Sequence, residues 1–137
     1  MDIIIVGCGK VGSTLADVLS SEHNVTVIDT DEEKIESVVN DYDVMGITGN
    51  CLQTSILAEA NVEKTDIFIA LTNSDEVNIL SCLIAKELKA RHCIARVRNP
   101  EFDQQLVFMR ENLKISMMVN PDYNAANEIA KVLRYPE

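Results

Sequence analysis

Six short apolar runs recur along the chain at intervals of about 22 residues. They are "DIIIV", "NVTVI", "DVMGIT", "DIFIAL", "HCIARV" and "KISMMV", which begin at residues 2, 24, 43, 66, 92 and 114. Their apolar residues follow one another instead of alternating with polar ones, which is typical of parallel strands covered on both faces. The pattern therefore predicts six parallel strands.

The segments between these runs carry apolar residues at helical spacing. After the first run a stripe is formed by Val11, Leu15, Val18 and Leu19, and after the second by Ile35, Val38, Val39 and Tyr42. Asn120 and Pro121 are typical of the N-cap and first residue of a last helix. Alternating strands and helices predict one domain over residues 1–137, with a Rossmann-like, doubly wound six-stranded parallel sheet and helices on both faces.

Two of the predicted helices are apolar beyond a single stripe. They are "SDEVNILSCLIAKEL", residues 74–88, and "PEFDQQLVFMREN", residues 100–112. Such helices are usually buried on two sides, which predicts a surface for self-association. A broad core stripe with a few scattered surface hydrophobes explains the same pattern equally well.

Composition and charge exclude several classes of protein. The chain has 22 acidic and 12 basic residues and a formal net charge of -10, so it would repel a nucleic acid backbone. Its four cysteines are far apart, and no histidine stands in ligand register with them, which argues against a zinc site or a disulfide framework. We expect a reducing cytosolic setting, with neither a targeting segment nor a membrane span.

A glycine-rich turn is the strongest candidate for chemistry. Gly7, Gly9 and Gly12 form a G-x-G-x-x-G pattern directly after the first strand and at the start of a predicted helix. In that setting the first glycine allows the tight turn, the second lets a diphosphate approach the backbone, and the third lets helix and strand pack closely. The phosphates would lie against the free N–H groups of the helix N-terminus. Lys10 either adds positive charge there or is an ordinary solvated lysine.

The second strand ends at an acid suited to a ribose. Asp29 follows Gly7 by 22 residues, close to the spacing at which dinucleotide-binding folds hydrogen-bond the ribose hydroxyls. A carboxylate there repels a 2′-phosphate, so we expect NAD(H) or another adenine nucleotide rather than NADP. Asp31 is better suited to capping the following helix.

Residues after the other strands complete the predicted binding set, because ligands in such folds lie beyond the carboxyl ends of the strands. Asn50 could bond the adenine edge, Thr72 and Asn73 a ribose or nicotinamide, and Arg98 a phosphate, although each could equally cap a helix or turn. Cys8 and Cys51 are either redox-active or small buried fillers, and the second is favoured. The set also includes Val11, Thr30, Lys34 and Leu71.

Taken together, these segments resemble the nucleotide-binding N-terminal lobe of RCK domains, also called KTN, of Trk/Ktr-type potassium transport regulators. The resemblance rests on "IIIVGCGKVGSTLA", "VTVIDTDEEKIE", "GITGNCLQTSILAEANVEKTDIFIALTNSDEVNILSCLIAK" and "IARVRNPE". It implies phosphate binding at the glycine turn, ribose binding at Asp29, an adenine-side loop at "TGNC", and a second ribose near Thr72 and Asn73. Asn50 stands where many relatives have Asp and Lys10 where several have Arg, so NAD or NADH and ATP or ADP both remain candidate ligands.

The resemblance also implies a regulatory role rather than catalysis. It predicts a homo-oligomer, a dimer or higher ring, that gates a membrane potassium transporter subunit and lies at the inner face of the membrane through that partner. The second, ligand-sensing lobe of such proteins is not expected in residues 1–137. Two other classes of protein stay open. The first is an enzyme, either a small NAD-dependent oxidoreductase or, less favoured, an S-adenosylmethionine-dependent methyltransferase. The second is a scaffold with a vestigial site. Both histidines are expected on the surface, and we expect neither catalytic residues nor a metal.

Overall fold

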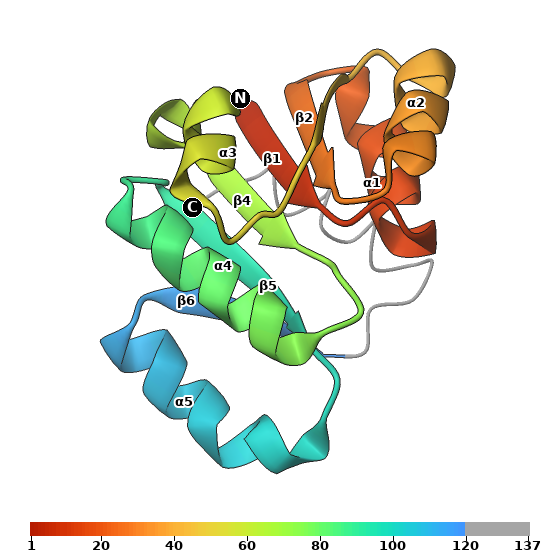
Figure 1. The fold of residues 1–137 in the computed structure, drawn as a ribbon. Coiled ribbons are helices and arrows are strands. Elements are labelled where there is room, and N and C mark those ends of the chain that lie inside the picture. The colour runs from red at the N-terminus through yellow and green to blue at the C-terminus, as the bar shows by residue number, and fades with distance from the viewer. Residues whose placement is uncertain (120–137) are drawn as a thin grey trace.

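A single parallel sheet with helices on both faces organises the chain (Figure 1). The computed structural model describes residues 1–119. In chain order the strands and α-helices are β1 Asp2–Val6, α1 Lys10–Ser20, β2 Asn24–Asp29, α2 Glu32–Asp41, β3 Met45–Thr48, α3 Thr54–Glu59, β4 Ile67–Ala70, α4 Asp75–Glu87, β5 His92–Val97, α5 Asp103–Asn112 and β6 Ile115–Val119. Short 3₁₀ turns precede β4 and α5, at Val62–Lys64 and Pro100–Phe102. The predicted fold class is confirmed.

The strand order determines where a ligand can enter. The order is β3-β2-β1-β4-β5-β6, with every pair parallel, so the chain builds outward from β1 to one edge and then returns to the other side of β1. Ile5 of β1 pairs with Val27 of β2 on one side and with Ile69 of β4 on the other. The reversal between β1 and β4 opens a crevice at the carboxyl ends of these strands.

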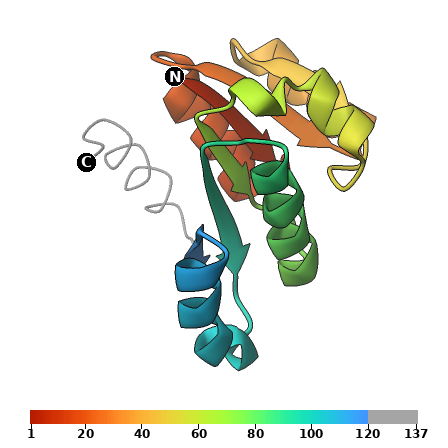
Figure 2. The ribbon, with the colours of Figure 1, turned by 90° about the vertical axis from the view of Figure 1, so that its left-hand side faces the viewer.

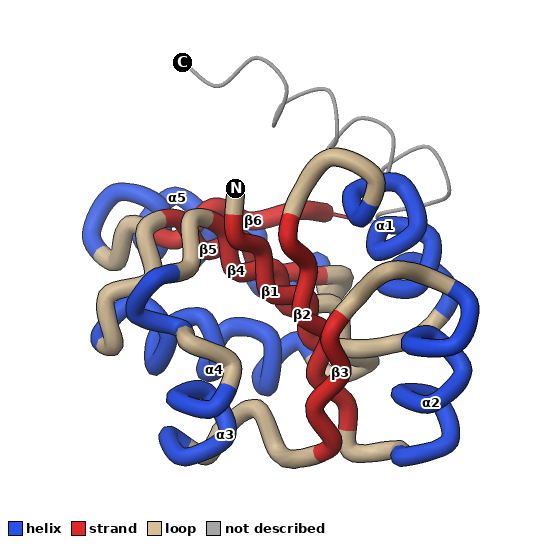
Figure 3. Tube along the Cα trace, turned by 90° about the horizontal axis from the view of Figure 1, so that it is seen from above, coloured by secondary structure: helices blue, strands red, loops and turns tan. Residues whose placement is uncertain are grey.

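Two apolar cores lie on the two faces of the sheet. Helices α1 and α2 cover one face and α3, α4 and α5 the other, as the view from above shows (Figure 3). Successive side chains of β1 alternate between the cores, since Ile3 and Ile5 belong to the α1 side and Ile4 and Val6 to the α3 and α4 side. Because both faces of the central strands are buried, their sequences read as unbroken apolar runs.

The third strand differs from its prediction. β3 begins at Met45, not at residue 43, and most of its residues are exposed, with Met45 69% exposed. Among residues 1–119, β3 is an edge strand, so no further strand pairs with its outer side. For the same reason Val39, which was expected in the buried stripe of α2, is 41% exposed while Ile35 and Val38 are buried.

The two broadly apolar helices also depart from a simple stripe. α4 buries the polar Asn78 and Ser81 completely and leaves Leu80 45% exposed. Val107 and Phe108 of α5 are more than half exposed. Figure 2 shows α5, in blue, at the opposite end of the molecule from α2, in orange. The predicted last helix, from Asn120 onward, lies outside the described residues.

Within residues 1–119, none of the helices combines the length and the hydrophobicity needed to cross a bilayer.

Candidate functional site

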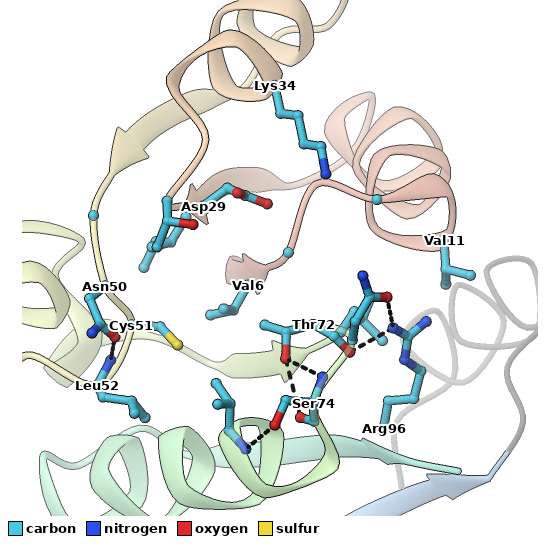
Figure 4. A pocket seen from close by; sticks show the side chains of 18 of the residues that line it. Val6, Val11, Asp29, Lys34, Asn50, Cys51, Leu52, Thr72, Ser74 and Arg96 are labelled. Atoms are coloured by element: carbon cyan, nitrogen blue, oxygen red, sulfur yellow. Dashed lines mark hydrogen bonds between the residues drawn. The ribbon is translucent and has the colours of Figure 1, made fainter.

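A cavity of about 660 Å³ lies at the carboxyl ends of the central strands (Figure 4). Its walls come from the segments that follow β1, β2, β3 and β4, together with one side chain of β5. The volume falls within the about 300–1,000 Å³ typical of small-molecule sites. The crevice predicted by the strand reversal is therefore a real pocket.

The three glycines of the first turn have different structural roles. Gly7 has a φ of 101°, and a Cβ there would lie 2.8 Å from the carbonyl oxygen of Leu71. A Cβ on Gly12 would overlap the carbonyl oxygen of Gly7, so this glycine allows α1 to pack against the turn. A Cβ on Gly9 would meet no atom within 4 Å. Because Gly9 lines the cavity, its missing side chain leaves space for a ligand.

The N-terminus of α1 is left without a side-chain cap. Its N-cap is Gly9, which has no side chain to bond the first N–H groups, and its first turn holds no acidic residue. By contrast, α2 is capped by Asp31 and α4 by Ser74, and both have two acids in the first turn. Since a helix N-terminus without a side-chain cap and the helix dipole both favour an anion, this end of α1 is suited to binding one.

Asp29 connects the glycine turn to the end of β2. One carboxylate oxygen accepts a hydrogen bond from the backbone N–H of Cys8, and the other from that of Asp31, both at 2.8 Å. A carboxylate has about four acceptor positions, so lone pairs remain for ligand hydroxyls. The side chain of Asp31 accepts from Glu33 and Lys34 N–H groups, which confirms its prediction as the cap of α2.

A buried amide organises the turn after β4. Asn78 is fully buried, and its Oδ1 accepts from the N–H and the hydroxyl of Thr72, at 2.8 and 2.7 Å. Its Nδ2 donates to the carbonyl oxygens of Thr72 and Arg96, at 3.1 and 3.0 Å. The guanidinium of Arg96 donates back to the Thr72 carbonyl at 2.6 Å. This network fixes the Thr72 turn, which forms one wall of the cavity, against β5.

The cavity is cationic although the chain is strongly acidic. Lys10, Lys34 and Arg96 line it, with Asp29 as its one acidic lining residue in the described part of the chain. In a chain with a net charge of -10, this concentration of positive side chains points to an anionic ligand.

The cysteines near the site are buried, which agrees with their interpretation as fillers. Burial is the largest cause that raises the pKa of the Cys8 thiol, to about 12, and the negative charge of Asp29 raises it further. Burial also raises the pKa of Cys51. Since the thiolate is the reactive form, both side chains are poor nucleophiles at neutral pH.

Most of the residues predicted from the sequence line this cavity. They are Gly7, Gly9, Lys10, Val11, Asp29, Thr30, Lys34, Asn50, Cys51, Leu71, Thr72 and Asn73. The structure does not bring Cys8, Gly12 and Arg98 into the lining. Cys8 and Gly12 lie behind the turn that they shape, while the guanidinium of Arg98 donates to the carbonyl oxygen of Asn73 at 2.8 Å. The two histidines lie near the amino ends of β2 and β5, away from the cavity.

Further lining residues were not predicted individually: Gly49, which belongs to the predicted "TGNC" loop, and Val6, Ile28, Leu52, Ser74, Val77 and Arg96. Most are apolar or small residues at the ends of strands and turns, which carry no chemical signal of their own. Arg96 is the exception, because an arginine within the apolar run "HCIARV" places a charge in a strand that is expected to be buried.

The fold and the cavity together define a Rossmann-like α/β domain with a pocket at the carboxyl ends of its central strands. The chain belongs to the TrkA-N domain family, whose pattern matches residues 3–121. The resemblance seen in the sequence is thus confirmed for the family.

Known proteins similar to this chain agree with that assignment. It is 38% identical over 136 residues to a Trk system potassium uptake protein TrkA homolog of Archaeoglobus fulgidus, covering 99% of this chain and 31% of that relative. The TrkA-N domain of the inner membrane protein ybaL from Escherichia coli has the same fold, with a TM-score of 0.75, 22% identity and coverage of 99% and 96%. The GsuK channel bound to NAD matches 78% of this chain and 20% of that chain, with a TM-score of 0.68 and 25% identity.

Proposed function

We propose that the cavity binds an adenine nucleotide, with NAD or NADH as the first candidate and ATP or ADP as the alternative. The observation that carries this proposal is the uncapped N-terminus of α1, which faces a cavity where Gly9 leaves open space. A diphosphate accepts hydrogen bonds from these N–H groups and gains from the positive end of the helix.

The other walls of the cavity complement the rest of such a ligand. Asp29 takes the hydroxyls of the adenosine ribose, and its charge disfavours a 2′-phosphate. Asn50 lies next along this wall. Its Oδ1 accepts a hydrogen bond from the N–H of Leu52 at 2.9 Å, so its Nδ2 group remains to donate to the adenine edge. Thr72 lies across the cavity from Asn50 (Figure 4). Asn73, the next residue along the chain, also lines the cavity, so this turn is suited to the second half of the ligand.

We further propose that the domain acts as a cytoplasmic regulatory module of a Trk/Ktr-type potassium transporter. Support comes from its membership in the TrkA-N family and from its similarity to a potassium uptake protein and to a channel bound to NAD. A ligand that binds two assembly states with different affinity shifts the balance between them, and couplings of about 1–3 kcal/mol are sufficient. Exposed Leu80, Val107 and Phe108 support a homo-oligomer built through α4 and α5.

Calorimetric titration with NAD, NADH, ATP and ADP tests the binding step. We expect saturable binding of at least one of them, without turnover when a panel of metabolites is added to NADH. Turnover would instead indicate a small oxidoreductase. Light scattering after size-exclusion chromatography tests the regulatory step, because a domain that stays monomeric with and without nucleotide at all concentrations contradicts it.

A further inference from the structure

Asp75 is a buried carboxylate that bonds outside its own helix. It is the first residue of α4 and only 9% exposed. A carboxylate at this position usually interacts with the N–H groups of its own helix, but here Ser74 caps α4 by accepting from the N–H of Val77. Both oxygens of Asp75 accept instead from the N–H of Arg98 at 3.1 Å, and Oδ2 also from that of Asn99 at 2.8 Å. The side chain thus joins the start of α4 to the connection between β5 and α5, which passes beside it (Figure 1).

A further bond links the same two segments. The guanidinium of Arg98 donates to the carbonyl oxygen of Asn73 at 2.8 Å, so this residue is held through both its main chain and its side chain. We call the bonds from Arg98 and Asn99 to Asp75 and Asn73 the Asp75 clasp. Asn73 and the preceding Thr72 line the cavity, whereas Asp75 itself does not. One end of the clasp is therefore a wall of the cavity.

The other end of the clasp leads directly into α5. Asn99 organises the 3₁₀ turn before this helix, because its Oδ1 accepts from the N–H of Glu101 at 3.0 Å and its carbonyl oxygen from that of Phe102 at 3.1 Å. Among the described elements, α5 packs chiefly against β6 and this turn. How Asn99 is held therefore affects the position of α5, whose exposed Val107 and Phe108 belong to the proposed subunit contact.

We propose that Asp75 is the positioning residue that couples the cavity to α5. A nucleotide bonded to the Thr72 turn restricts the motion of that turn, the clasp extends the ordering to Asn99, and α5 is held more firmly where subunits meet. Ordering of this kind couples two sites without a large displacement. A carboxylate is needed because a neutral amide has one acceptor oxygen, and its NH₂ group cannot accept from an N–H. This inference rests on the proposed nucleotide site.

Amide hydrogen exchange of the wild type and of Asp75→Asn, with and without saturating NADH or ATP, tests the coupling. In the wild type, a nucleotide that slows exchange at the glycine turn also slows exchange of the Arg98 and Asn99 amides by at least about five-fold, the lower end of usual couplings between sites. In Asp75→Asn the effect at these two amides falls below about two-fold, while the effect at the glycine turn is retained.

Asp66→Asn is the matched control. It removes an equal charge and a bond to a backbone N–H, that of Asp2, at the amino end of β4 instead of the carboxyl end. We expect this variant to keep the nucleotide effect both at the glycine turn and at Arg98 and Asn99.

Each remaining outcome overturns the inference. A full nucleotide effect at Arg98 and Asn99 in a folded Asp75→Asn variant contradicts it, even if both amides exchange faster than in the wild type, because the role of Asp75 would then be purely structural. If the variant does not fold, the wild type decides, since slower exchange at the glycine turn without slower exchange at Arg98 and Asn99 refutes the coupling. Failure of the proposed function looks different, because neither NADH, NAD⁺, ATP nor ADP would then slow exchange at the glycine turn.

Discussion

Replacing each glycine of the first turn by alanine separates folding from binding. Gly7→Ala places a Cβ 2.8 Å from the Leu71 carbonyl oxygen at a φ of 101°, and such strain costs about 1–3 kcal/mol. Gly12→Ala drives a Cβ into the Gly7 carbonyl, and overpacking of this kind costs about 1–3 kcal/mol. At about 2–4 °C per kcal/mol, both variants lower the melting temperature by several degrees.

Gly9→Ala behaves differently, because its Cβ meets nothing in the folded chain. Alanine is a poorer N-cap than glycine, but it also reduces the entropy of the unfolded chain, so the net change in stability stays within about 1 kcal/mol. The same Cβ occupies space that a diphosphate needs, and we expect nucleotide affinity to fall at least about ten-fold, or 1.4 kcal/mol.

Thermal unfolding and calorimetric titration of the three variants measure the two effects independently. A Gly9→Ala variant that is folded and binds nucleotide as tightly as the wild type refutes the steric reasoning. A loss of stability as large as that of Gly7→Ala would show that a Cβ at Gly9 does meet other atoms of the folded chain.

Three further predictions follow from single side chains. Asn78→Ala removes four hydrogen bonds of a fully buried side chain and should lower the free energy of unfolding, measured with denaturant, by about 2–4 kcal/mol. The control Asn112→Ala, at the exposed end of α5, should lower it by less than about 1 kcal/mol. Equal losses of stability in the two variants would refute the role of the Asn78 network. NADPH should bind at least about ten-fold more weakly than NADH, and Asp29→Ala should narrow that difference, while an unchanged ratio would remove this carboxylate from the ribose site. The Cys8 thiol, with its pKa raised from 9.0 to about 12, should react with iodoacetamide at pH 8 about a thousand-fold more slowly than an ordinary thiol, and rapid labelling of the folded protein would contradict its burial.

Much of this fold is readable from the sequence because the central strands are buried on both faces. Their apolar runs mark β1 and β4 directly, and the glycine turn and Asp29 mark the ends of β1 and β2. These signals are local, since each depends on a few consecutive residues and on the backbone geometry that those residues favour.

The features that were missed depend on tertiary placement. Exposure of Met45 and Val39 follows from the edge position of β3, which strand order decides and a local pattern does not. Burial of Asn78 is set by polar partners in the Thr72 turn and β5, not by helical periodicity. Arg96 was overlooked because a charge within an apolar strand does not reveal whether it faces a pocket or solvent.

In the proposed binding mode, the backbone N–H groups at the start of α1 hold a diphosphate while the carboxylate of Asp29, at the end of β2, holds the adjoining ribose. Titration of the double variant Gly9→Val with Asp29→Ala, against the nucleotide that the wild type binds best, tests it most directly. We expect a folded double variant to have no measurable affinity. Undiminished affinity in that folded variant would contradict it.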